Sequence, residues 1–414
     1  MSDYTTKTYQ MKREILSFSQ KISKGCARDK QKFTADMIYG LLATKSCVLS
    51  EIAHELQEPI RKKNTIDRLS RQLAEGTEHK TILNYSRLVK KCLPEAPLVF
   101  VDDSDVIKPY GKKFEDLGVV RDGSSLDKKQ EKGYHVTEVT ALTRNSNHPI
   151  SLFSKIHSSR EKDYVSANEI TFDALRKSSQ IAGKNATFVF DRGYDMNKLF
   201  TFCYANELQF IIRLASKRLL FYKGKWLKST TLRDSRKGKI KTNVMFEGKK
   251  QSCYITCINS QITESRKRIK VLFVYGLGEA PMMLATNRDI CCKDDAIRVV
   301  RAYLKRWRIE EYFRFKKQHF GFENFRVRSL TAMNALNDYL SYAIGFIALL
   351  SMKSKYNQLK ANVLKEANAL RLTVCFDYYR LAKGIAGLLK NAHAGIKDWF
   401  KPLRPKYRQL SFFD

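Results

Sequence analysis

The feature that most constrains this 414-residue chain is a pair of short apolar runs that each end in aspartate. Residues 97–102 read PLVFVD and residues 186–191 read ATFVFD. Continuous apolar runs of this length are typical of central strands that are buried on both faces. An aspartate at the end of such a run is costly to bury unless a cation neutralises it, although each one alone could equally cap the following turn. Two such runs favour an open sheet with an acidic site where its strands end.

The elements around these runs predict an α/β fold, with a mixed sheet flanked by helices. Further strands are expected at 134–142, 148–157 and 209–214, and helices at 166–180 and 195–206. A Lys- and Arg-rich stretch of short strand-like pieces then interrupts the pattern before helices resume. The expected organisation is a helical region at 1–95, an α/β core at 96–214 and 289–352, a β-rich insertion at 215–288, and a basic helical region at 353–414.

The charge balance indicates a polyanionic partner. Lys and Arg number 76 against 42 Asp and Glu, which gives a formal net charge of +34. Such a surface attracts nucleic acid, and a ribosome-like or membrane-surface protein is the simpler alternative. The apolar stretch at 339–351 is shorter than the roughly 20 residues of a membrane span, so a buried core helix is expected there. No secretory signal opens the sequence, and the nine irregularly spaced cysteines predict reduced thiols in a cytosol.

The first hundred residues contain three short amphipathic stretches, at 35–45, 48–57 and 62–76. Their apolar residues recur at helical spacing, and tight connections join them. Three such helices resemble a helix-turn-helix unit, and a plain helical bundle fits the pattern about as well. The third stretch carries the basic residues that favour a DNA-binding face, namely Lys62, Lys63, Arg68 and Arg71.

A long helix predicted at 293–320 carries a polar stripe. Tyr303, Arg306, Glu310 and Lys317 fall within an arc of roughly 60° and span about 21 Å on an ideal helix. Such a stripe suits a polyanion or a metal ion. A solvated face with an Arg306–Glu310 ion pair is the simpler alternative, and the spacing alone slightly favours it.

The acidic residues together suggest one kind of chemistry. In the segment VDDSD, three aspartates compete for a single role: Asp102, Asp103 and Asp105. With Asp191 and Glu310, one of them would supply three carboxylates for two divalent cations, an arrangement that activates a water or a 3′-hydroxyl for phosphoryl displacement. The sequence contains no P-loop, GxSxG or HExxH motif that would indicate another reaction.

The spacing Y-x2-R-x3-E-x6-K at 303–317 resembles the YREK signature of bacterial insertion-sequence transposases, the insertion-sequence-four family of DDE enzymes. The segments VDDSDVIKPYG, RDGSS with KGYHV, and FDRGYD are similar to strand motifs of that family, and the β-rich insertion is also a family trait. The resemblance covers roughly residues 95–350. It implies an RNase H-like catalytic domain that uses two Mg²⁺ or Mn²⁺ ions and acts as a homodimer on double-stranded transposon ends and target DNA.

The resemblance also implies roles for individual residues. It selects Asp191 as the second catalytic acid and ligand and Glu310 as the third. The first is Asp102, followed by Ser104 where the family more often has threonine; a register shifted by one selects Asp103 instead. The residues expected to grip the DNA backbone are Tyr303, Arg306 and Lys317, with Arg192 and Arg213 either doing the same or pairing with nearby carboxylates.

The expected function is cut-and-paste transposition in a bacterial cytoplasm: cleavage at the transposon ends and transfer of the 3′-hydroxyl ends into target DNA. Three alternatives remain. They are a domesticated DNA-binding protein that no longer cleaves, a structure-specific nuclease of the same fold, and an RNA-binding protein without catalysis. The three acids of the proposed site are all present, which argues against the first alternative.

Overall fold

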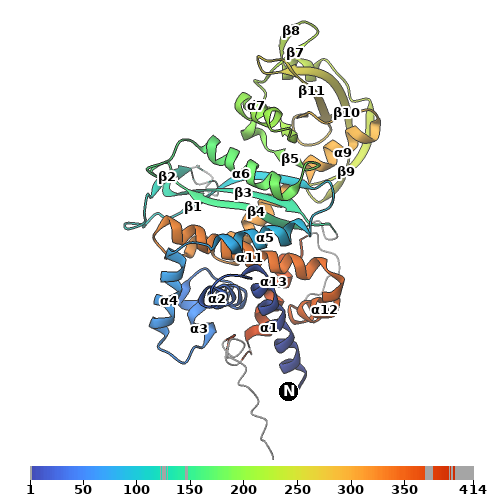
Figure 1. Ribbon diagram of the computed structural model, residues 1–414. Coiled ribbons are helices and arrows are strands. Elements are labelled where there is room, and N and C mark those ends of the chain that lie inside the picture. The colour runs from blue at the N-terminus through green and yellow to red at the C-terminus, as the bar shows by residue number, and fades with distance from the viewer. Residues whose placement is uncertain are drawn as a thin grey trace, which may run out of the picture.

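The computed structural model describes residues 2–121, 123, 127, 129–144, 148–368, 376–390, 392, 395 and 396. Its centre is a mixed β-sheet with helices on both faces (Figure 1). This confirms the predicted fold class. Three residues of the RDGSS motif (Asp122, Ser124 and Ser125), Cys375 and most of the basic tail at 391–414 lie outside the described residues.

Five strands form the core of the sheet in the order β4-β3-β1-β5-β6. β3 runs antiparallel to β1 and β4, whereas β5 is parallel to β1 and β6 is parallel to β5. This is the arrangement expected of an RNase H-like sheet. The short strand β2 pairs with the beginning of β3. The bounds are β1 Leu98–Ile107, β2 Gly118–Arg121, β3 Gln130–Leu142, β4 Pro149–His157, β5 Thr187–Phe190 and β6 Gln209–Arg213.

The first acidic run does not end its strand, contrary to the expectation for Asp102. β1 continues to Ile107 because its long neighbour β3 keeps pairing with it, as far as the pair Ile107 and Gly133. On the other side, β5 stops at Phe190, which pairs with Val101. Asp102 therefore lies within β1, one residue beyond the last pair with β5.

The β-rich segment extends the same sheet. Its strands pair antiparallel with one another, and β12 pairs with β6, so one sheet of twelve strands runs through the described part of the chain. In Figure 1 these strands form the upper part of the molecule. The elements are β7 Leu219–Tyr222, β8 Lys225–Lys228, α8 Ser229–Asp234, β9 Ile240–Phe246, β10 Lys249–Ile262, β11 Lys267–Tyr275 and β12 Met282–Thr286.

The helices before the sheet share a hydrophobic core with those at the end of the chain. α2, α3 and α4 match the three predicted helices, and α2 packs against both α11 and α13. The core includes Ile15 of α1, Leu41 of α2 and Leu381 of α13. The bounds of the early helices are α1 Ser2–Ile22, α2 Arg28–Thr44, α3 Leu49–Leu56, α4 Lys62–Ala74 and α5 His79–Lys90.

Helices cover both faces of the core strands of the sheet, with α6 on one face and α11 on the other (Figure 1). The remaining elements follow the chain. They are α6 Ala167–Ala182, the short helix η1 Arg192–Tyr194, α7 Asn197–Ala205, α9 Lys293–Leu304, α10 Trp307–Arg314, the π-helical turn η2 Phe315–His319, η3 Phe322–Asn324, α11 Leu330–Met352, η4 Ser354–Tyr356, α12 Asn357–Glu366 and α13 Tyr378–Lys390.

The helix predicted at 293–320 is not continuous. α9 ends at Leu304 and α10 begins at Trp307, and the backbone between them tightens. There the amide of Arg306 donates to the carbonyl of Tyr303 at 2.9 Å and the amide of Ile309 to that of Arg306 at 3.0 Å, which are i to i+3 bonds rather than i to i+4. The π-helical turn η2 then widens the spiral before Phe320. The ideal spacing of the polar stripe is therefore lost.

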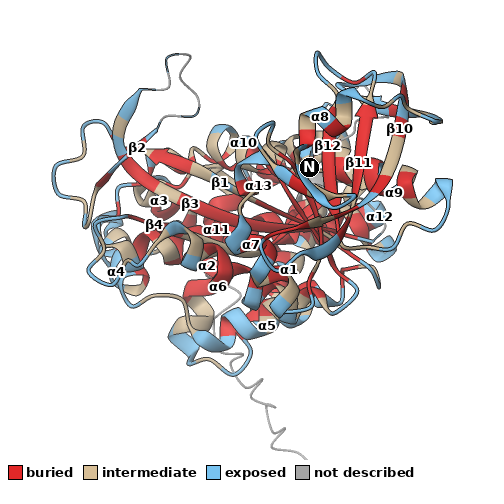
Figure 2. Cartoon of the chain, turned by 90° about the horizontal axis from the view of Figure 1, so that it is seen from above, coloured by how far each residue is buried: buried red, intermediate tan, exposed pale blue. Residues whose placement is uncertain are grey.

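α11 is the long apolar helix of the chain. It is long and apolar enough to cross a membrane by composition, with a mean hydropathy of 1.3, but 83% of that window is buried within the protein. It lies against β4 and α2, and Figure 2 shows it buried along most of its length. α11 is thus a core helix, as predicted.

A buried ion pair joins η2 to the sheet. The ammonium of Lys316 contacts the carboxylate of Glu138 at 2.9 Å and also donates to Asn337 at 2.6 Å. Glu138 accepts further bonds from Ser151 and Ser154 of β4. The side chains of Lys316 and Glu138 are 1% and 0% exposed, so neither charge can be solvated by water. The pair fixes η2, and with it α10, over β3.

Removal of one partner should therefore cost far more than removal of both charges. We expect Lys316→Met to lower the free energy of unfolding by about 3–5 kcal/mol, because it leaves the buried carboxylate of Glu138 without a cation. The double variant Lys316→Met with Glu138→Gln should be more stable than Lys316→Met alone. Urea denaturation measures both. A double variant no more stable than the single one would contradict this account of the pair.

Candidate active site

Three carboxylates from distant segments meet at one guanidinium. Arg306 Nη1 lies 3.1 Å from Asp102 Oδ2, Nη2 lies 2.5 Å from Glu310 Oε1, and Nε lies 4.0 Å from Asp191 Oδ1. The carboxylates of Asp191 and Glu310 are 39% and 40% exposed, whereas that of Asp102 is 23% exposed. The cluster therefore opens to solvent on one side and is enclosed by the sheet on the other.

The pairing of the strands explains this convergence. β1 and β5 are parallel, and their last paired residues are Val101 and Phe190, so Asp102 and Asp191 follow at the same level. Side chains alternate between the two faces of a strand. Phe100, Val189 and Ile309 share one hydrophobic cluster, which places Asp102, Asp191 and α10 on the same face of the sheet.

The other residues of the polar stripe also reach the strands. The hydroxyl of Tyr303 donates to Asp191 Oδ1 at 3.2 Å. Lys317 pairs with Asp105 at 3.2 Å and with Glu323 at 3.4 Å. The tightened turn and the π-helical turn change the direction of the helix. The side chains of Tyr303 and Lys317 therefore still reach the acids that follow β5 and lie in β1, although the helix is broken.

The two arginines predicted beside the sheet lie in different settings. Arg192 is exposed at the start of η1, directly after Asp191. Arg213 ends β6. Burial and the carboxylate of Asp191 raise the pKa of Tyr303, and the guanidinium groups of Arg306 and Arg213 oppose that rise.

Asp103 points away from this cluster. Its carboxylate accepts hydrogen bonds from Thr137 Oγ1 at 2.6 Å and from the Tyr194 hydroxyl at 2.8 Å. No sequence pattern predicts a functional role for Thr137 or Tyr194. Strand alternation was the available signal, since consecutive aspartates on one strand must face opposite sides of the sheet.

The electrostatics of the cluster leave it short of positive charge. Burial raises the pKa of Asp102, the guanidinium of Arg306 opposes this, and Asp103 and Asp191 raise it further, so that it reaches about 7. Burial lowers the pKa of Arg306, but the neighbouring carboxylates outweigh burial and hold it above its ordinary value. The arginine is therefore a fixed cation, and a single guanidinium does not balance the three carboxylates around it.

A comparison with known families decides the identity of this domain. The family described as Transposase DDE domain matches residues 95–337, which is more than half of the chain. The chain belongs to the transposase DDE domain family. No curated protein matches it.

Two solved structures similar to this DDE transposase share little sequence with it. One is a piggyBac transposase synaptic complex with hairpin DNA, at 9% identity and a TM-score of 0.45, covering 96% of this chain and 83% of that one. Another is the NurA nuclease from Sulfolobus solfataricus, at 10% identity and a TM-score of 0.28, covering 70% of this chain and 96% of that one. Both TM-scores lie below 0.5, so neither likeness adds to the family match.

The donor chemistry of the transposase cluster suits a hard divalent cation. Carboxylate oxygens are the ligands that Mg²⁺ and Mn²⁺ prefer, and burial keeps the pKa of Asp102 raised although the guanidinium of Arg306 opposes this. Within the described ranges, however, no group of three or more Asp, Glu, His or Cys side chains is already arranged around a metal position. The carboxylates instead face the guanidinium of Arg306.

The predicted DNA-binding residues of the N-terminal region fall into two groups. Lys62, Lys63 and Arg71 are exposed on α4. Arg68 instead contacts Asp36 at 2.8 Å and Glu58 at 3.1 Å, and Lys32 joins the same two acids at 2.6 Å. Asp36 is 1% exposed, so this network holds α2 to α4. Its carboxylates occupy the guanidinium of Arg68.

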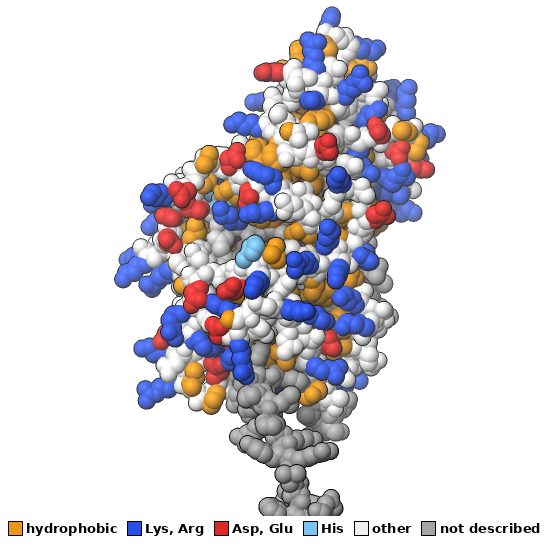
Figure 3. Space-filling model, viewed as in Figure 1, with side chains coloured by type: hydrophobic (Ala, Val, Ile, Leu, Met, Phe, Trp, Pro, Cys, Tyr) orange, Lys and Arg blue, Asp and Glu red, His pale blue; other side chains and the backbone are white. Residues whose placement is uncertain are grey.

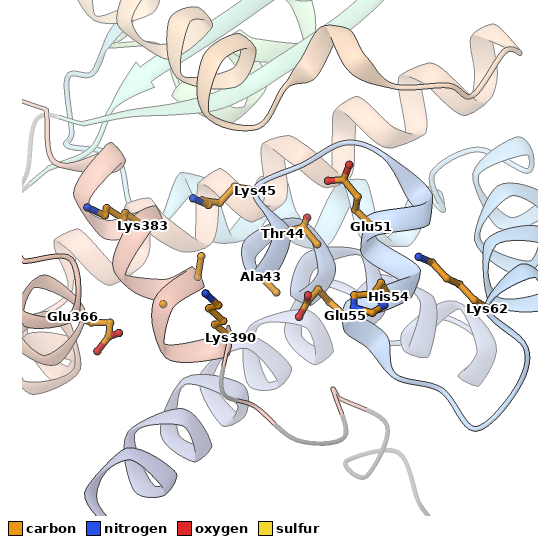
Figure 4. A pocket seen from close by; sticks show the side chains of 12 residues that line it. Ala43, Thr44, Lys45, Glu51, His54, Glu55, Lys62, Glu366, Lys383 and Lys390 are labelled. Carbon is orange, nitrogen blue, oxygen red and sulfur yellow. The ribbon is translucent and has the colours of Figure 1, made fainter.

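A cavity of about 610 Å³ lies beside these helices, away from the carboxylate cluster. Figure 4 shows it between α3 on one side and α13 on the other, with lysines and glutamates from both sides pointing toward it. Its lining mixes both signs of charge and includes Lys45, Glu55, Lys62 and Lys383.

The eight cysteines of the described chain, among them Cys253 and Cys257, are unbridged thiols, in line with the reduced thiols predicted.

The pKa of Asp102 makes a prediction about the metal-free transposase. The unfolded chain ionises this carboxyl near pH 3.8 and the folded chain near pH 7, so its contribution to stability is fully present below pH 3.8 and is lost as the pH rises through 7. Asparagine carries no such penalty. With a chelator present, the melting temperature of Asp102→Asn should rise relative to that of the natural protein, and this difference should grow between pH 4 and pH 8. Asp173→Asn, on the exposed face of α6, is the control, and a pH-independent difference for Asp102→Asn would contradict the assignment.

Proposed function

We propose that this protein is a cut-and-paste DNA transposase that binds transposon terminal inverted repeats, cleaves at the transposon ends and joins the 3′-hydroxyl ends to target DNA. One observation carries the proposal. Within a transposase DDE domain, Asp102, Asp191 and Glu310 come from three distant segments and converge on Arg306. These three acids are the proposed catalytic residues, and Asp103, with both oxygens engaged elsewhere, is not among them.

The same three carboxylates would hold the divalent cofactor, proposed as two Mg²⁺ or Mn²⁺ ions. When bound, such ions stabilise the attacking and leaving oxygens of an in-line phosphoryl displacement. Arg306 is the resident cation of the site, and a DNA phosphate offers its guanidinium a bidentate partner in place of the carboxylates. Binding of DNA would therefore release the three carboxylates from Arg306.

The proposed DNA contacts follow from position and charge. Tyr303 and Arg306 contact the acids of the cluster, and Lys317 pairs with Asp105 further along β1. Arg192 directly follows Asp191, and Arg213 ends β6. Basic side chains are also scattered over the visible face of the molecule, among acidic and apolar ones, on the insertion as well as on the helices (Figure 3). Exposed lysines on the insertion include Lys217, Lys223, Lys225, Lys228, Lys249 and Lys250. We propose a homodimer that holds two transposon ends, with Lys62, Lys63 and Arg71 of α4 as further contacts.

The proposal is tested at Glu310. We expect Glu310→Gln to lower the rate of cleavage of transposon-end DNA by about three orders of magnitude, because it removes one ligand of an ion worth several kcal/mol to the transition state. Binding of the same DNA should change little. Glu311→Gln is the matched control, since Glu311 lies on the same helix and pairs with Arg314 at 2.9 Å.

Two readouts separate the alternatives. End cleavage and DNA binding are measured by gel assays on labelled duplexes from the flanks of the gene, and strand joining is measured with pre-cut ends and supercoiled target. Cleavage that survives Glu310→Gln would contradict the site. Cleavage without joined product would indicate a structure-specific nuclease, and binding without cleavage by the natural protein would indicate a domesticated DNA-binding protein. Preference for RNA in a competition at matched salt would contradict the DNA assignment.

A further inference from the structure

The second aspartate of the VDDSD segment is fully engaged on the far face of β1. Asp103 Oδ1 accepts from Thr137 Oγ1 at 2.6 Å, and Oδ2 accepts from the Tyr194 hydroxyl at 2.8 Å. Thr137 is the direct neighbour of Asp103 on β3. Both oxygens of this carboxylate thus have short hydrogen bonds to hydroxyls, and neither faces the cluster around Arg306.

The chain of hydrogen bonds continues to a buried histidine. Thr137 gives its hydroxyl proton to Asp103, so it must accept from His157 Nε2, which lies 3.0 Å away. Burial and the nearby His135 and Lys155 lower the pKa of His157 to about 3, so the imidazole is neutral. With Asp103 ionised, both hydrogen bonds of the row His157–Thr137–Asp103 run toward its carboxylate.

Tyr194 connects this row to the turn that carries Asp191. The turn η1 begins directly after Asp191, and the amide of Tyr194 donates to the carbonyl of Asp191 at 3.1 Å. The ring of Tyr194 is buried and lies 5.5 Å from that of Phe190. The Tyr194 hydroxyl therefore ties the segment after β5 to β1.

The same turn is held from its other side by the start of the insertion. Asp195 accepts from the amide of Ala215 at 2.7 Å and from Arg218 Nε at 2.8 Å. Arg218 also donates to Asn197 at 2.5 Å. On this side of the sheet the segment 191–195 is thus anchored at Tyr194 and Asp195, in addition to the contacts of Asp191 with Tyr303 and Arg306 on the other side, and Tyr194 connects it directly to the strand that bears Asp102.

We propose that Asp103 is a positioning residue that, through its hydrogen bond to Tyr194, holds Asp191 beside Asp102 at the separation at which the two carboxylates can share a divalent cation. This inference rests on the proposed function. It explains the paired aspartates of VDDSD: one carboxylate faces the reacting side of β1, and the other fixes the neighbouring strand end from the opposite side. Groups behind metal ligands commonly change metal affinity or activity 10- to 100-fold when removed.

The test uses Tyr194→Phe in the full chain, which deletes one hydroxyl and keeps the buried ring. We expect the dissociation constant for Mn²⁺, measured by titration calorimetry and by the electron paramagnetic resonance of free Mn²⁺, to rise about 10- to 100-fold. End cleavage at a fixed Mn²⁺ concentration should fall by a similar factor, and DNA binding should not change. Tyr85→Phe is the matched control, because Tyr85 is equally buried and its hydroxyl donates to the Ser341 carbonyl in α11 at 3.3 Å.

A second pair of variants tests the same row without touching Tyr194. Thr137→Val removes the donor to Asp103 at nearly constant volume and should weaken Mn²⁺ binding in the same direction. Thr137→Ser keeps the hydroxyl and should restore binding to within about threefold of the natural protein. A purely structural role would move the melting temperature of Thr137→Val without moving its Mn²⁺ affinity, and that result would overturn the proposal.

Asparagine variants separate a positioning residue from a ligand. Asp103→Asn retains an acceptor oxygen and should bind Mn²⁺ far better than Asp102→Asn. Equal loss of Mn²⁺ binding in these two folded variants would make Asp103 a ligand and overturn the proposal. Unchanged Mn²⁺ affinity in both Tyr194→Phe and Thr137→Val would also overturn it while leaving the transposase function intact. A natural protein that neither binds Mn²⁺ nor cleaves DNA would overturn the proposed function itself.

Discussion

The compensation of buried negative charge is the constraint on which this active-site region depends. Asp102 lies within β1, largely buried, with Asp103 and Asp191 near it, and without a cation its ionised form would be strongly disfavoured. Arg306 supplies that cation and contacts all three acids of the proposed site. The guanidinium thus holds the three acids together. We propose that it competes with a divalent ion for these acids, and that a bound phosphate or divalent ion changes this balance.

The fold brings these charges together by two devices on the same face of the sheet. Parallel pairing of β1 with β5 sets Asp102 and Asp191 at one level, while the buried pair of Lys316 and Glu138 fixes the segment that follows Glu310. Glu138 lies directly opposite Asp102 on β3. The sheet therefore carries its site on one strand and the anchor for the third acid on the next. The insertion extends the sheet at the far side of β6, and its strands add basic surface beyond the site.

Much of this arrangement could be predicted from the sequence because it follows from local patterns. Apolar runs predicted β1 and β5, and helical periodicity predicted α2, α3, α4 and α11. The end of β1 and the break at Lys305 and Arg306 could not be predicted in this way, since a partner strand sets the first and the packing of α10 sets the second. The partners of Arg68 and Asp103 are likewise distant in sequence, and no periodicity reveals them. Sequence patterns identified residues whose side chains could take part in catalysis or binding, whereas tertiary contacts decided which of them face one another.

The most direct test of the central claim is anomalous diffraction at the manganese edge from crystals of the full chain grown with Mn²⁺ and transposon-end DNA. The account predicts manganese signal among Asp102, Asp191 and Glu310, with Arg306 displaced from at least one of these carboxylates toward a DNA phosphate. Manganese bound elsewhere, or an Arg306 that keeps all three contacts while the crystal form cleaves its DNA, would contradict it.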